Sequence, residues 1–240
     1  LLHAFPCSNR MWDHQIEALS AGQRRVLAPD LPGFGESPLP TTAPSLETVV
    51  QQVHQDLAHL GVDRCVVAGL SLGGYVAMEW MRKYPESVGA WMLCDTKATI
   101  DSDAGREGRK AMVSEVMSEP ESVGQVLETR MMTGLLGVTS QAQRPSVVDQ
   151  VRSWLRQVSA SSIVWYQEAM LKRPDSRPVL RRLKAPVLVL WGSEDTLSPE
   201  DEQREMLTCL QNPHWELVPD AGHLSAVESP QRVSQAMADF

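Results

Sequence analysis

The segment from Arg64 to Trp80 constrains the fold more than any other part of this chain. A short apolar run that contains β-branched residues leads into Gly69-Leu70-Ser71-Leu72-Gly73, and a helical pattern follows. A strand that turns at once into a helix forces the turn residue into strained backbone, so small neighbours are needed on both sides. We therefore predict a strand, a sharp turn at Ser71 and a helix in immediate succession.

The chemical setting of Ser71 follows from that turn. Its side chain would stand at a helix N-terminus, where unpaired N–H groups and the helix dipole favour a developing negative charge. This arrangement is a nucleophile elbow. A chain of this kind contains Gly-x-Ser-x-Gly by chance with a probability of roughly 5–10%. The motif therefore gains its weight from the flanking elements and from partner residues further along the chain.

Strands and helices alternate over most of the sequence, which indicates βαβ units and a mostly parallel sheet. Leu1-Leu2-His3 has the pattern of a strand end and no initiator methionine, so we expect that residues precede Leu1. The other expected strands lie at 25–30, 65–70, 88–95, 185–192 and 214–219, and helices are expected near 11–19, 45–60, after Ser71 and at 230–240.

The alternation stops between about Thr96 and Leu183, where helical patterns recur near 104–118, 120–132, 145–158 and 160–171. Two interpretations are open for this segment. It is either a small helical subdomain with its own core or a lid whose methionines and aromatic side chains face a substrate. For any single residue, core packing is the commoner role. The side chains we expect to contact a substrate are Trp12, Met131, Trp154, Trp165, Leu197 and Leu224.

Composition restricts the class of function. The chain has 22 basic and 30 acidic side chains, and its formal net charge of −8 disfavours a nucleic-acid or acidic-membrane surface. No apolar run approaches the length of a membrane span, and no signal peptide is visible. The four cysteines show no paired spacing, which favours thiols in a reducing compartment over disulfides or a zinc site. These features predict a cytoplasmic protein without a metal.

Two residues after later strands are candidate partners for Ser71. A serine hydroxyl is a weak nucleophile unless a base takes its proton, and the base needs a third group that holds its tautomer. Ligands of open α/β sheets bind beyond the carboxyl ends of the strands, so both partners should follow strands. Asp195 follows one predicted strand, and His223 follows the next in a glycine-flanked loop. We predict that Ser71, His223 and Asp195 act together as nucleophile, base and acid.

Other acids and histidines are rivals for these roles. Asp95 also ends a predicted strand and is the alternative acid. Asp30 is expected in a turn, and Glu194 is expected to point away from the site. His3 lies in the loop opposite the nucleophile turn, where we expect a structural or oxyanion-supporting role. The remaining histidines have no place in a loop after a later strand; they are His14, His54, His59 and His214.

Together these features resemble the α/β-hydrolase fold superfamily over nearly the whole chain. Serine, acid and histidine stand in the order of that superfamily. The segments that carry the resemblance are His3–Pro6, Asp30–Ser37, Gly69–Gly74, Gly192–Asp195 and Gly222–His223. The resemblance implies a core of residues 1–95 and 184–240, with a helical cap, 96–183, inserted after the sixth strand. It also implies an oxyanion hole made by the backbone N–H groups of Phe5 and Leu72, although Ala4 replaces the glycine of the superfamily's His-Gly pattern.

Within the superfamily, the short cap and the Asp-x-x-Gly-x-Gly-x-Ser segment are similar to 3-oxoadipate enol-lactonases and related small esterases. The resemblance implies a serine hydrolase that cleaves a small carboxylic ester or lactone through an acyl-enzyme, without a cofactor, as a monomer or homodimer. Two alternatives use the same residues: C–C bond hydrolysis or acyl transfer, and a ligand receptor without turnover. Ser71 argues against haloalkane dehalogenases and epoxide hydrolases, which need a carboxylate at that position.

Overall fold

The computed structural model describes residues 1–240 and contains one parallel sheet. Its four strands lie side by side in the order of the sequence: β1 (Cys65–Leu70), β2 (Val88–Cys94), β3 (Val187–Gly192) and β4 (His214–Val218). Every residue of β3 is buried, as expected for a strand whose two faces are both covered. Because all four strands are parallel, the loops after them meet at one edge of the sheet.

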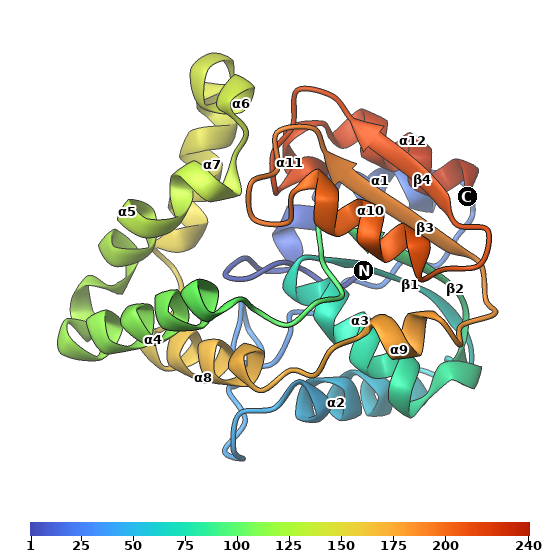
Figure 1. The fold of residues 1–240 in the computed structure, drawn as a ribbon, viewed down its shortest axis with the longest axis horizontal. Coiled ribbons are helices and arrows are strands. Elements are labelled where there is room, and N and C mark those ends of the chain that lie inside the picture. The colour runs from blue at the N-terminus through green and yellow to red at the C-terminus, as the bar shows by residue number, and fades with distance from the viewer.

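Helices cover both faces of the sheet (Figure 1). On one face α1 (Asp13–Ala21) packs against α12 (Pro230–Asp239). The helices of the other face are α2 (Leu46–His59), α3 (Leu72–Lys83), α9 (Arg177–Leu180) and α10 (Glu200–Thr208). Shorter elements complete the fold; they are η1 (Asn9–Trp12), η2 (Pro85–Ser87) and α11 (Ser225–Glu228). The α/β class with a parallel sheet, predicted from the alternation of elements, is confirmed, and the helices flank the sheet on both faces.

The boundaries of α2 show how local sequence sets an element. The Ser45 hydroxyl accepts a hydrogen bond from the Glu47 N–H at 3.2 Å and so caps the helix. Val49 and Val53 lie on the buried face at helical spacing. The chain leaves the helix through Gly61, whose φ of +68° suits glycine. The predicted helix over 45–60 is confirmed.

Residues 25–30 differ from the prediction, because they form no strand. Leu2 makes a single parallel bridge to Gly69 of β1. Between the segment 25–30 and Leu1–Leu2 there is one hydrogen bond, which the backbone nitrogen of Leu1 donates to the Leu27 carbonyl oxygen at 2.7 Å. Pro29 has no N–H to donate. An extended segment with one such bond lacks the repeated pairing that defines a strand.

A long helical insertion separates β2 from β3. It contains α4 (Asp103–Ser118), η3 (Pro120–Ser122), α5 (Val123–Leu135), α6 (Val138–Gln143), α7 (Pro145–Leu155) and α8 (Ala160–Leu171), followed by α9. The predicted helical patterns are confirmed, with α6 as an additional short helix. The insertion projects to one side of the sheet, where α4 packs on α8 and α5 on α7 (Figure 1). The resemblance implied an insertion after the sixth strand of the sheet. In this structure the insertion follows β2, which is the second of four strands.

The core of the insertion is continuous with the core of the sheet. Leu127 and Leu155 of the insertion belong to the same hydrophobic cluster as Leu93 and Val189 of the strands, and all four are fully buried. The insertion therefore does not have a separate core, which was one of the two interpretations of the sequence. None of its helices, nor any other helix of the chain, is both long enough and apolar enough to span a membrane.

Candidate active site

Ser71 stands at the predicted sharp turn between β1 and α3. Its φ of +54° and ψ of −110° lie outside the regions that L-residues usually occupy, at a cost of about 1–3 kcal/mol. Glycine is required on both sides by close approach. A Cβ at Gly69 would lie 2.2 Å from the Gly73 carbonyl oxygen, and a Cβ at Gly73 would lie 2.1 Å from the Leu2 carbonyl oxygen. The packing of the turn thus explains the motif.

The structure brings Ser71, His223 and Asp195 together in one hydrogen-bonded array. His223 Nε2 lies 2.7 Å from Ser71 Oγ, and His223 Nδ1 lies 3.0 and 2.9 Å from the two carboxylate oxygens of Asp195. A carboxylate only accepts hydrogen bonds, so Nδ1 carries the proton and Nε2 is free to accept the proton of Ser71. All three are held at the carboxyl ends of the strands, within reach of one ligand.

Asp195 is held as a carboxylate by the loop after β3. Its Oδ1 accepts the N–H groups of Leu197 at 2.8 Å and Ser198 at 3.1 Å, and the Ser198 hydroxyl donates to Oδ2. Burial on its own would raise the pKa of Asp195. The electrostatic interaction with His223, with hydrogen bonds from His223 and Ser198, outweighs that effect and lowers the pKa of Asp195. Ser198 was not among the predicted residues, although its place three residues after an aspartate is a common turn signal.

Asp95, the alternative acid, occupies a different position. Its Oδ1 accepts the Gly192 N–H at 2.8 Å, and the Ser225 hydroxyl donates to Oδ2. It is completely buried and makes no hydrogen bond to His223. Burial, with the nearby charge of Asp195, raises its pKa well above the ordinary range. The geometry therefore assigns the orienting position to Asp195 and leaves Asp95 as a link between β2, β3 and the loop of His223.

The backbone N–H groups of Phe5 and Leu72 are both free of acceptors within the chain. His3 holds the loop that contains Phe5. The Leu31 N–H donates to His3 Nε2, and His3 Nδ1 donates to the Ala4 carbonyl oxygen, both at 2.9 Å. Burial lowers the pKa of His3 to about 4, so the ring is neutral at neutral pH. His3 has the structural position expected from the sequence.

Two further acids also lie as expected. Asp30 accepts the backbone N–H groups of Asn9 and Glu36 and thereby closes a turn. Glu194 points away from Asp195 and accepts hydrogen bonds from the N–H and hydroxyl of Thr139 in the insertion. Neither carboxylate faces His223.

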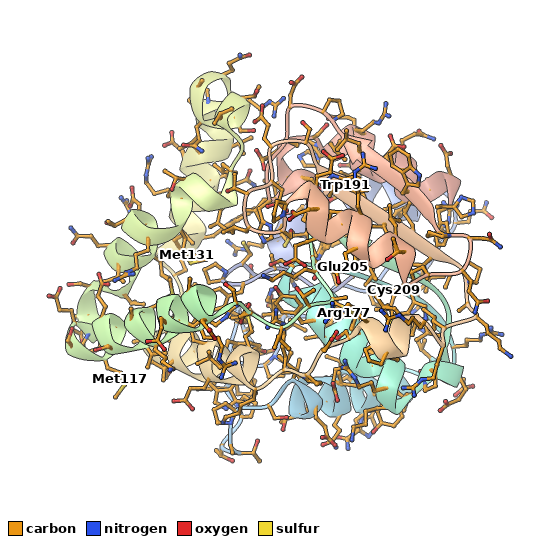
Figure 2. The ribbon with its side chains drawn as sticks, viewed as in Figure 1. Met117, Met131, Arg177, Trp191, Glu205 and Cys209 are labelled. Atoms are coloured by element: carbon orange, nitrogen blue, oxygen red, sulfur yellow. The ribbon has the colours of Figure 1, made fainter.

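A cavity of about 370 Å³ opens in front of the array. Ser71, His223 and Phe5 line it from the sheet side, and Met112 and Met131 line it from the insertion. Figure 2 shows Met131 on the side of α5 that faces the sheet, whereas Met117 points outward from the end of α4 and is 66% exposed. The methionines of the insertion therefore divide between the cavity wall and the surface.

Of the six residues predicted to contact a substrate, two line this cavity and four do not. Met131 and Leu197 line the cavity. The other four do not, so the prediction is corrected for them. Trp12 and Leu224 are fully buried away from it, Trp154 lines a separate polar cavity, and the Trp165 indole N–H donates to the Thr42 carbonyl oxygen. Apolar character indicates burial, but it does not say which helix face looks into a cavity.

The separate polar cavity is larger, about 630 Å³, and lies between residues 6–10, 30–37 and 154–162. Neither Ser71 nor His223 is in its wall. Of the two, the smaller cavity is the one that contains Ser71 and His223. No group of three or more histidine, cysteine, aspartate or glutamate side chains is arranged to hold a metal ion.

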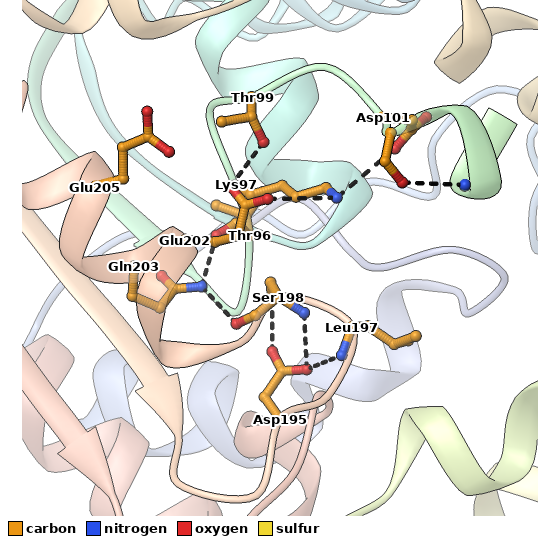
Figure 3. Close-up of polar contacts among 12 residues, drawn as sticks. Thr96, Lys97, Thr99, Asp101, Asp195, Leu197, Ser198, Glu202, Gln203 and Glu205 are labelled. Carbon is orange, nitrogen blue, oxygen red and sulfur yellow. Dashed lines mark hydrogen bonds and ion pairs between the residues drawn. The ribbon is translucent and has the colours of Figure 1, made fainter.

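Polar contacts tie the start of the insertion to the loop of Asp195 (Figure 3). The Gln203 side-chain amide donates to the carbonyl oxygens of Thr96 and Ser198, both at 2.8 Å. The Thr99 hydroxyl donates to Glu202 at 2.7 Å. These residues were not identified from the sequence, because no local pattern brings a post-β2 loop to α10. They connect the segment that enters the insertion to the carboxylate that holds His223.

A parallel α/β sheet with a serine at a strand–helix turn, and with histidine and aspartate after later strands, defines an α/β-hydrolase. Comparison with known proteins agrees. The chain belongs to the Alpha/beta hydrolase family, whose model matches residues 1–236.

Several relatives are informative. A thermophilic esterase from Thermogutta terrifontis, solved with malate bound, is 33% identical with a TM-score of 0.93, over 99% of this chain and 86% of that chain. The 3-oxoadipate enol-lactonase 2 of Acinetobacter baylyi is 27% identical over 95% of this chain and 82% of its own. The 2-hydroxy-6-oxononadienedioate/2-hydroxy-6-oxononatrienedioate hydrolase of Paraburkholderia phymatum is 25% identical over 94% of this chain and 79% of its own.

Proposed function

We propose that this protein is a serine hydrolase that cleaves a small carboxylic ester or lactone. One observation carries the proposal: the His223 Nε2 atom lies 2.7 Å from Ser71 Oγ while the opposite ring nitrogen faces the Asp195 carboxylate. A serine is activated by this geometry because a neutral, oriented imidazole can accept its proton. The esterase and enol-lactonase relatives support the same chemistry.

The proposed reaction begins when Ser71 Oγ attacks the substrate carbonyl carbon and His223 Nε2 takes the hydroxyl proton. The carbonyl oxygen becomes an oxyanion that accepts hydrogen bonds from the free N–H groups of Phe5 and Leu72. One such donor contributes about 3–4 kcal/mol to the stability of the transition state. His223 then protonates the leaving alcohol, and an acyl-enzyme remains on Ser71. Water, activated by His223, releases the acid.

In this proposal residues 96–183 act as a cap over a core formed by 1–95 and 184–240. Its side chains line the cavity opposite Ser71, so they select the substrate while the core performs the attack. The volume of about 370 Å³ suits a small ester or lactone and not a long lipid chain.

C–C bond hydrolysis is the second candidate. The Paraburkholderia phymatum relative, which aligns with 94% of this chain, is named as a hydrolase of hydroxy-oxo-dienedioates and trienedioates, and these names contain no ester or lactone. The same nucleophile and base would act, and only the leaving group would be a carbanion. Parallel assays on 4-nitrophenyl acetate and on a vinylogous diketone distinguish the two. Labelling of Ser71 by a fluorophosphonate without turnover of either compound would instead favour a ligand receptor.

The variant Ser71→Ala tests the proposed function. We expect kcat for ester hydrolysis to fall by about 10⁴-fold or more, because the nucleophile is lost. Ser153→Ala is the matched control, since that serine is exposed on α7 and bonds only to the Gln150 carbonyl oxygen. Folded Ser71→Ala protein with full esterase activity would exclude the proposal.

A further inference from the structure

The charged side chains of the Ser71 cavity differ in sign from the protein as a whole. Lys97, Arg109 and Arg130 are in its wall, against one acidic side chain, Asp101. The chain itself carries a formal net charge of −8. A cavity rich in cations inside an acidic protein has a local potential that attracts anions.

Asp101 does not neutralise these cations. It is buried, and it is shared by two of them, Lys97 and Arg109, and by Arg173 behind the wall. Arg109 Nε lies 2.7 Å from Oδ2, Arg173 Nη1 lies 3.0 Å from Oδ2, and Lys97 Nζ lies 3.9 Å from Oδ1. Burial raises the pKa of Asp101, but the three cations outweigh this and lower it, so the group is a carboxylate. The single negative charge of Asp101 is thus divided among three cations, of which Lys97 also has Glu202 at 3.9 Å.

Lys97 is the cation of the cavity wall whose ammonium group donates no hydrogen bond within the chain. Its ammonium lies 3.9 Å from Asp101 and 3.9 Å from Glu202, and both distances exceed a hydrogen bond (Figure 3). The carboxylate of Glu202 instead accepts the hydroxyl of Thr99. The Lys97 side chain is only 16% exposed. An ammonium has three donors, and burying them without acceptors is costly.

We propose that the cavity takes an ester or lactone that carries a free carboxylate, and that this carboxylate accepts hydrogen bonds from Lys97. The inference rests on the proposed function and names its substrate class. Arg109 adds positive potential beside Lys97, while Arg130 is paired with Glu115 and is 39% exposed, so it acts by attraction at a distance.

A carboxylate fits this site better than a phosphate. Phosphate recognition usually employs the paired donors of a guanidinium group. The Arg109 fork is already occupied, since its Nε donates to Asp101 and its Nη1 donates to the Gln167 side-chain oxygen at 2.9 Å. The donor that is still available is the Lys97 ammonium, and its single positive charge equals the single negative charge of a carboxylate in magnitude.

The test compares the monoethyl esters of succinic, glutaric and adipic acids with their neutral diethyl esters. We expect the wild-type protein to cleave the best monoester with a kcat/KM, per ester group, at least about tenfold above that of its diester. Lys97→Met should lower that ratio by about tenfold. Lys110→Met is the control, because that lysine is exposed on α4 and pairs only with Glu107, and its ratio should equal that of the wild type.

A second variant changes the ratio in the opposite direction and does not depend on the folding of Lys97→Met. Glu202→Gln keeps an acceptor for Thr99 but removes a negative charge near Lys97, so the preference for monoesters should increase. An unchanged ratio in Lys97→Met, or equal cleavage of monoesters and diesters by the wild type at every chain length, overturns the inference.

The experiment separates this inference from the proposed function. Diester cleavage that depends on Ser71 but shows no charge preference retains the hydrolase and rejects the anionic substrate. If no ester is cleaved, the hydrolase proposal fails, and calorimetric titration of monoethyl adipate into Ser71→Ala decides the inference. The monoethyl esters of succinic and glutaric acids are titrated in the same way. Binding that Lys97→Met weakens supports the inference, and absence of binding of all three monoesters rejects it.

Discussion

Replacing Asp195 by asparagine tests how the array depends on one hydrogen-bond pattern. The backbone N–H groups of Leu197 and Ser198 both point at Oδ1, and a backbone N–H cannot become an acceptor. The asparagine oxygen must therefore occupy the Oδ1 position. Its NH₂ group then occupies the Oδ2 position, where it faces His223 Nδ1 at about the present 2.9 Å. The Ser198 hydroxyl can rotate and accept from it.

An NH₂ group next to Nδ1 selects the tautomer with its proton on Nε2. That nitrogen then donates to Ser71 and cannot remove its proton. In the serine-protease template the same exchange lowers kcat by about 10⁴, which is about 5.5 kcal/mol in activation free energy, and we expect a loss of that order here. The free energy of unfolding should change by about 1 kcal/mol or less, because every donor around the side chain keeps an acceptor.

The assay is steady-state ester hydrolysis together with urea unfolding of the same samples. Asp95→Asn is the matched control, because Asp95 is also a buried aspartate at the end of a strand but does not touch His223. It should keep kcat within about tenfold of the wild type. An Asp195→Asn variant with kcat within tenfold of the wild type, or an equal loss in Asp95→Asn, would refute the assignment of the acid.

Two further predictions concern stability. Because the pKa of Asp95 is raised in the folded protein, its protonation contributes stability that is complete below the ordinary pKa of about 4 and is lost as the pH rises through the folded-state pKa. In urea unfolding, Asp95→Asn should therefore become progressively more stable relative to the wild type from pH 5 to pH 8. A difference that stays constant with pH would contradict this. Gly73→Ala should lower the free energy of unfolding by about 1–3 kcal/mol, because its Cβ would lie 2.1 Å from the Leu2 carbonyl oxygen. Gly108→Ala, in α4 with no atom within 4 Å of the added carbon, should stabilise by up to about 1 kcal/mol, and similar effects of both would contradict the steric argument.

Much of the fold was predictable because its signals are local. The cap residue of α2, the glycines around Ser71 and the apolar runs of the strands each act through neighbours a few positions away. Residues 25–30 show the limit of such reasoning. Their apolar pattern favours a strand, but a strand exists only where a neighbouring segment supplies continuous hydrogen-bond partners. That partner is a tertiary property.

The residues of the candidate site also differ in how far local sequence signals could predict them. Order and spacing predicted Ser71, His223 and Asp195, but they left Asp95 open, because both aspartates follow strands of the same sheet. Only the direction of each side chain separates them. Lys97 had no signal at all. The role proposed for it depends on the position of Glu202, which lies more than a hundred residues away in the chain.

The sequence by itself determined the elements of the proposed attack: a serine at a strained strand–helix turn and two partners after later parallel strands. Backbone geometry dictates the residues of such a turn, and the parallel sheet then collects the loops at one edge. The tertiary structure decided the shape and the charges of the cavity in front of that serine. Packing between segments distant in sequence decides which faces of the insertion line the cavity and which cation there lacks a hydrogen-bond acceptor. No local pattern encodes that packing.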